Sequence, residues 1–134
     1  MTQAIIFTND NGGVSVCIPT GEISIQEVLA KDCPAGAIIL DTAMLPQGSD
    51  AQFFDAWELA DGQVSVNFAK AKTIKLVQFN AAAVAEAQKR QLNTLAGIDN
   101  EVADADFSAS LAAGRASIAS ATTTADLVAV SNPA

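Results

Sequence analysis

The stretch from Ala56 to Leu95 reads AWELADGQVSVNFAKAKTIKLVQFNAAAVAEAQKRQLNTL and contains the only tryptophan of the chain. Its first part has two short apolar runs on either side of a turn at Ala60–Gln63, which predicts a hairpin. Asn67 then offers a helix N-cap. No Gly or Pro follows from Phe68 to Ala96, so we expect one long helix there. The sequence therefore predicts a compact head, residues 1–67, and a helical arm, residues 68–134.

The head shows the signals of a small mixed domain. Residues 3–8 and 14–18 are β-rich and flank the turn-forming run Asn9–Gly13, which predicts a first hairpin. Ser24 and Glu27 form a capping box for a short helix over residues 25–31. A buried strand over residues 37–41, a loop over residues 41–50 and the Trp57 hairpin follow. We expect an α+β fold, with a β-rich N-terminal domain of two hairpins and one short helix, then a long helix and a helical C-terminal segment. The side chains expected to anchor its core are Phe7, Val16, Phe54 and Trp57.

The arm carries an apolar seam with a heptad-like spacing of three and four residues. Asp104 can cap a second helix. Its large apolar residues Phe107, Leu111 and Ile118 are four and seven positions apart, which is also a heptad-like spacing. A helix of this length, roughly 43 Å, is too long for a small head to cover. The seam must therefore pack either on the C-terminal segment folding back or on the same helix in sister subunits, and the sequence leaves both open. The candidate interface residues are Ile74, Val77, Ala81, Val84, Leu92, Leu95, Phe107, Leu111 and Ile118.

Charge is unevenly distributed along the chain. The net charge is −8, and residues 1–67 carry nine acids and one lysine, whereas residues 68–90 carry five bases and one acid. An acidic chain is a poor partner for nucleic acid, because phosphate binding needs clustered Lys and Arg. The basic part of the arm is either a solvated helix face or a surface that docks on acidic protein.

Few side chains of this chain suit catalysis. There is no His, which removes the commonest general base and the commonest metal ligand. Gly12-Gly13 is not followed by the Lys-Ser/Thr of a phosphate loop, and residues 9–21 lack the oxygen ligands of a calcium loop. We therefore expect no enzyme activity, no catalytic residue, no cofactor and no metal. The start of the chain lacks the features of a signal peptide, no apolar run is long enough to span a bilayer, and Cys17 and Cys33 are expected to stay reduced.

Several segments resemble the small proteins of tailed bacteriophages that are labelled phage tail assembly chaperones. The resemblance is carried by Ile5-Ile6-Phe7, Gly13-Val14-Ser15-Val16, Pro19, Val28–Gly36, Asp55–Leu59, Gly62–Asn67, Lys70–Ile74 and, more loosely, Ala121–Val130. None of these motifs is catalytic. After Ile74 that family continues with a helix rich in Arg and Lys, whereas this chain continues with an Ala-rich helix and its apolar seam.

The resemblance implies a non-enzymatic bacteriophage virion protein, made in the host cytoplasm. The apolar seam favours a permanent, tail- or tail-fibre-associated place in the particle, reached by binding other virion proteins and by homo-oligomeric helix packing. Two alternatives share the same sequence features. One is a capsid decoration or head-fibre protein, and the other is an intracellular tail assembly chaperone. No nucleic acid or membrane partner is expected.

Overall fold

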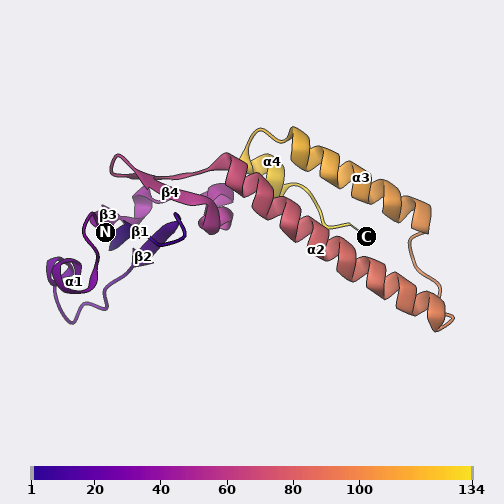
Figure 1. Ribbon diagram of the computed structural model, residues 1–134, viewed down its shortest axis with the longest axis horizontal. Coiled ribbons are helices and arrows are strands. Elements are labelled where there is room, and N and C mark those ends of the chain that lie inside the picture. Colours follow the sequence, from indigo (N-terminus) through magenta and orange to yellow (C-terminus); the bar gives the residue numbers. More distant parts are fainter. Residues whose placement is uncertain (1, 134) are drawn as a thin grey trace. The chain divides into compact units, whose positions relative to one another are not determined.

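A computed structural model describes residues 2–133 and confirms the α+β fold, with β-strands in the N-terminal part and helices after them (Figure 1). The chain divides into two compact units, Met1–Ala71 and Lys72–Ala134. The boundary lies in the first turn of the long helix, slightly beyond the expected Asn67. We call these parts the head unit and the helical unit.

The head unit contains a three-stranded antiparallel sheet. Strand β1 (Gln3–Thr8) lies between β2 (Val14–Cys17) and β3 (Ile38–Asp41), so that Ile6 is paired with Val16 on one side and Ile38 on the other. The β1–β2 turn follows the sequence prediction. The Asn9 side chain accepts hydrogen bonds from the backbone amides of Asn11 and Gly13, and Gly12 has a positive φ.

A second hairpin covers one face of this sheet. Strands β4 (Trp57–Ala60) and β5 (Gln63–Val66) are joined by Asp61 and Gly62, both with positive φ, as the two central residues of a tight hairpin require. Trp57 packs here in an apolar cluster, and its indole Nε1 donates a 3.0 Å hydrogen bond to the Asp50 carbonyl. The buried members of the cluster are Ala4, Ile6, Val14, Trp57 and Val64.

The opposite face of the sheet faces helix α1 (Ile25–Asp32). Ser24 caps this helix as predicted, with its hydroxyl accepting from the Glu27 amide. Because side chains alternate along a strand, Ile5 points away from the Trp57 cluster, and it is nevertheless fully buried. Val28 of α1 is buried as well, and α1 contacts β1. The head unit thus has three layers, with β1 at its centre.

The core anchors expected from the sequence are only partly correct. Trp57 is buried, Phe7 and Val16 are half-buried, and Val16 packs against the cluster. The prediction that Phe54 anchors the core is wrong, because Phe54 is 43% exposed while its neighbour Phe53 is buried. The reason is local. The expected loop contains the 3₁₀ segments η1 (Thr42–Met44) and η2 (Gly48–Ala56), and the kink of η2 at Phe53 turns that ring inward. Phe54 instead lies tilted beside the Trp57 ring.

Helix α2 (Phe68–Leu95) begins directly after Asn67, which the sequence predicted as its N-cap. The Asn67 side-chain oxygen accepts from the Lys70 amide, and its amide nitrogen donates to Glu58 on β4. Lys70 closes this group with a 2.8 Å ion pair to Glu58. The hydrogen bonds from Lys70 and Asn67 lower the pKa of Glu58. The end of the second hairpin and the start of α2 are thereby fixed by one small polar network.

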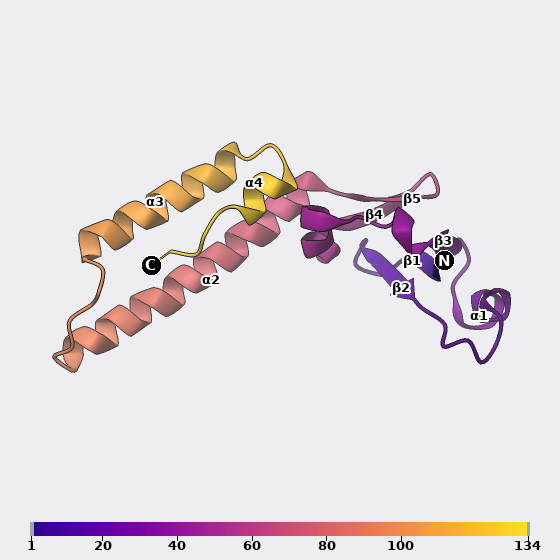
Figure 2. The same cartoon turned by 180° about the vertical axis from the view of Figure 1, so that it is seen from behind.

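The helical unit is a helical hairpin. Figures 1 and 2 show α3 (Asp104–Ser120) running back alongside α2, with the short helix α4 (Thr124–Val128) after it. The C-terminal segment therefore folds back, but it does not cover the expected seam, because Val77, Val84, Leu92 and Leu95 remain exposed. Gly97, with a positive φ, ends α2, and the Ile98 amide donates to the Asn93 carbonyl as in a Schellman motif.

The two helices approach most closely where Phe79 meets Gly114. Phe79 is fully buried, and a Cβ atom placed on Gly114 would lie 2.3 Å from the tip of its ring. No side chain other than hydrogen fits there, so the glycine is required by packing although its φ is ordinary. Polar contacts tie the helices on either side of this point. Lys72 Nζ donates to the Ala119 carbonyl, and Arg115 Nε donates to the Asn80 side chain.

Arg90 fixes the far end of the hairpin. Its side chain is only 7% exposed, it pairs with Asp104 at 2.6 Å, and it donates to the Val102 carbonyl. The guanidinium also lies over the Phe107 ring, 4.9 Å from its centre. A buried cation is costly unless it is paired and hydrogen-bonded, and here every partner comes from the loop after α2 or the start of α3. The register of α3 on α2 is thereby set at both ends.

We predict that Gly114→Ala destabilises the chain by about 2 kcal/mol, because the added methyl group overlaps the Phe79 ring. This loss should appear although Ala is a better helix former than Gly by about 1 kcal/mol. Urea unfolding measures the free energy. Phe79→Leu removes the end of the ring, so the double variant Phe79→Leu/Gly114→Ala should cost less than the sum of the single changes. A Gly114→Ala variant that is more stable than the parent chain would contradict the packing described here.

A second prediction concerns acid and the cap of α4. Asp126 Oδ2 accepts from the backbone amides of Thr122 and Thr123 and from the Thr122 hydroxyl, and these hydrogen bonds lower the pKa of Asp126. A carboxylate with a lowered folded-state pKa stabilises the fold above its unfolded pKa, and that contribution is lost as pH falls through the folded pKa. Hydrogen-exchange protection of the α4 amides should therefore fall on acidification from about pH 5 to about pH 2. In Asp126→Asn, which has no carboxylate, protection should be lower at pH 5 and should lack this step.

Candidate interaction surface

One side of α2 exposes a row of aliphatic side chains that we call the outer stripe: Val77, Ala81, Val84, Leu92 and Leu95. The four large members are 62%, 58%, 65% and 78% exposed in chain order, and Ala81 is exposed as well. All five were candidate interface residues in the sequence. Ile74, the sixth candidate on this helix, is half-buried at the start of the row. The described part of the helical unit thus leaves most of the predicted seam uncovered.

The buried side of α2 lies opposite the outer stripe. Within the helical unit its buried members are Phe79, Ala83 and Arg90. Successive residues of an α-helix turn by about 100°, so positions 79, 83 and 90 project from the side opposite positions 77, 81 and 84. One helix therefore carries two rows with the same three-and-four spacing. The row with the aromatic ring and the arginine faces α3, and the aliphatic row faces away.

The candidate interface residues on α3 belong to the inside of the unit. Phe107 and Ile118 are buried and Leu111 is half-buried. Their own chain covers Phe107 and Ile118 and partly covers Leu111, and their place in an interface between chains stays a prediction. The heptad spacing found them correctly as packing residues, but periodicity does not say which partner covers a helix.

Charge separates the two sides of α2 as well. Between Thr73 and Leu95 the charged residues are Lys75, Glu86, Lys89 and Arg90. By helical periodicity all four project toward the half of the helix that contains Phe79. The outer half of this segment consists of uncharged residues. A solvent-facing side of a surface helix normally carries charged residues, so the side with the outer stripe has the composition of a protein-binding surface.

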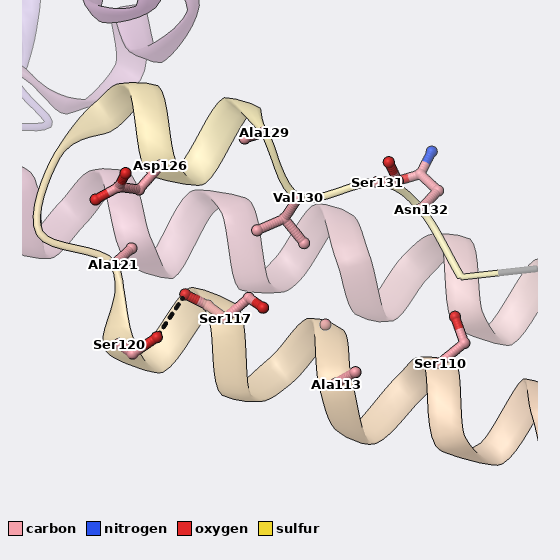
Figure 3. Close-up of a pocket in the computed structure, with 11 residues that line it drawn as sticks. Ser110, Ala113, Ser117, Ser120, Ala121, Asp126, Ala129, Val130, Ser131 and Asn132 are labelled. Atoms are coloured by element: carbon pink, nitrogen blue, oxygen red, sulfur yellow. Dashed lines mark hydrogen bonds between the residues drawn. The ribbon is translucent and has the colours of Figure 1, made fainter.

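A cavity of about 540 Å³ lies within the helical unit between α3 and the C-terminal segment (Figure 3). Its walls are short side chains, mostly Ala and Ser, and Val130 points into the space. The one carboxylate in its lining, Asp126, already accepts the hydrogen bonds that cap α4. The cavity therefore offers little charge with which to orient a ligand, and it is a weaker candidate for function than the outer stripe.

Among residues 2–133 no group of three or more His, Cys, Asp or Glu side chains could hold a metal ion. No helix within the same range is both long and apolar enough to cross a bilayer.

The chain was also compared with known proteins. Protein-family models, curated proteins and solved structures gave no match.

Proposed function

We propose that this protein is a non-enzymatic structural component of a tailed-bacteriophage particle that assembles by pairing its outer stripe with that of further copies. The observation that carries the proposal is the exposed, charge-free aliphatic stripe of α2, which runs opposite the packed side of the same helix. A tail or tail-fibre position is the first choice, in line with the sequence resemblance. Neighbouring virion proteins would then be the partners of the assembled copies.

The chemistry of the stripe favours a second copy of this chain as its occupant. Val77, Ala81 and Val84 are four and three residues apart, and Leu92 and Leu95 are three apart, spacings that suit a partner helix with the same pattern. A second copy of α2 has that pattern by definition. From Thr73 to Leu95 the positive charges of α2 lie on its other half, and Lys70 at its start is paired with Glu58. Two copies can therefore meet through their stripes without bringing those charges face to face.

The expected strength of this association is modest. Burying a fully exposed Val or Leu side chain contributes about 1.5 to 3 kcal/mol, and a symmetric pair would bury four large, partly exposed residues from each copy. Association itself costs roughly 4 to 15 kcal/mol. Because the gain and the cost are of similar size, we expect oligomers in solution to form only at raised protein concentration. In a particle, neighbouring subunits would hold the copies together.

We predict that Val84→Asp weakens self-association at least about tenfold, because an unpaired carboxylate is costly in an apolar contact. Sedimentation velocity over a range of protein concentrations measures the effect. Since Val84 is exposed within its own chain, the melting temperature of the dilute variant should stay within about 2 °C of the parent chain.

Ala109→Asp provides a matched control, because it adds the same charge at an exposed position of α3 away from the stripe. It should associate as the parent chain does. If the parent chain stays monomeric at the highest concentrations, or if Val84→Asp and Ala109→Asp behave alike, the outer stripe is not the self-association surface.

The place of the protein in the phage is tested on particles. Mass spectrometry of purified virions should find this chain at a fixed copy number, and cryo-microscopy of labelled particles should place it on the tail or its fibres. A position on the capsid would favour a decoration or head-fibre protein. Absence from particles, together with a stable complex with a tail protein in infected-cell lysate, would overturn the virion assignment and favour a tail assembly chaperone.

A further inference from the structure

The two cysteines of the chain come together in the head unit. Cys17 is the last residue of β2, and Cys33 is the residue that ends α1. Along β2, Val14 and Val16 face the Trp57 cluster, so Cys17 projects from the opposite face of the sheet. That is the face next to α1, where Ile5 is fully buried. Strand alternation and helix position thus bring two residues that are far apart in the sequence to one side of the sheet.

The two thiols are neighbours. Both cysteines are free and half-buried, and Cys17 is among the groups that raise the pKa of the Cys33 thiol. Burial raises the pKa of the Cys33 thiol, and the neighbouring Cys17 and the Asp32 carboxylate raise it further. At neutral pH Cys33 is therefore mainly a thiol and not the reactive thiolate. The two cysteines thus lie on one face of the sheet, and both are in the reduced form in this structure.

We propose that Cys17 and Cys33 form an intramolecular disulfide when the protein meets an oxidising disulfide such as oxidised glutathione. The thiolate of one cysteine attacks a sulfur of oxidised glutathione, which forms a mixed disulfide and releases one glutathione thiol. The second cysteine thiolate then displaces the remaining glutathione. The two protein thiols lose two electrons and two protons, and one oxidised glutathione becomes two reduced molecules. This inference is independent of the proposed function.

The bond would secure helix α1. This helix has eight residues, and only Val28 among them is buried. A helix this short depends on its packing, because it is not stable alone. A covalent link from its end to β2 would close the chain between positions 17 and 33 and restrict the unfolded state. For a loop of this length we expect the melting temperature of the head unit to rise by about 10 to 25 °C on oxidation.

The experiment uses the full chain, reduced or equilibrated with glutathione redox buffers, then unfolded with an alkylating agent and digested with trypsin. Lys31 is the only Lys or Arg in residues 1–67, and it lies between the two cysteines. Cleavage after Lys31 separates Cys17 and Cys33 into two peptides, which stay joined only if the disulfide has formed. We expect one joined pair from the oxidised, monomeric protein and two alkylated peptides from the reduced protein. The rate of formation should rise with pH above neutrality, because the attacking thiolate becomes more abundant.

Cys17→Ser and Cys33→Ser are the matched controls. Each should keep one alkylated cysteine and show no rise in melting temperature with oxidised glutathione. If the oxidised parent chain yields two separate alkylated peptides, or if its cysteines join only between chains, the proposal is overturned. The peptide measurement needs no variant, so it remains decisive even if a serine substitution impairs folding.

Discussion

The contact between the Phe79 ring and the bare backbone of Gly114 is the constraint on which the helical unit depends. It lets α3 lie close enough to α2 for Phe107 and Ile118 to be buried. Once the helices are in this register, Arg90 reaches the Val102 carbonyl and Asp104, and Lys72 reaches the Ala119 carbonyl. Each of these polar contacts would be misplaced if α3 were shifted along α2. The Phe79–Gly114 contact thus sets the distance between α2 and α3. The hydrogen bonds at the two ends of the hairpin set the register of α3 along α2.

The same contact explains why an apolar surface is left over. A helix that packs on one neighbour buries one side, and here that side is centred on Phe79. Val77, Val84 and Leu92 lie on the opposite side of α2, where α3 cannot cover them, although they are as apolar as the residues that pack. Keeping four large aliphatic residues in water is unfavourable, and a chain gains by covering them. The proposed assembly function follows from this division of one helix into two sides.

In the head unit the two faces of the central sheet are covered unequally. Its central strand β1 has buried residues on both faces, and a five-residue cluster around Trp57 covers only one of them. Helix α1 supplies the cover for the other face, but with a single buried residue, Val28. The cysteine pair lies at the end of this weaker layer. A redox-dependent bond at that point would act where the noncovalent packing is least extensive, and it would leave the Trp57 cluster unchanged.

The sequence alone determined the features that depend on neighbours in the chain. Asn9–Gly13 and Asp61-Gly62 form turns because their backbones accept positive φ, and Ser24 and Asn67 start helices because their side chains accept from nearby amides. The outer stripe was also predictable as a periodic row. Only the tertiary structure decided which row of α2 is covered, and that Phe53 and not Phe54 is buried. The physical reason is that two rows of equal spacing are equivalent within one helix. The choice between them depends on Gly114, Val102 and Asp104, whose proximity to α2 is created only when the chain folds back.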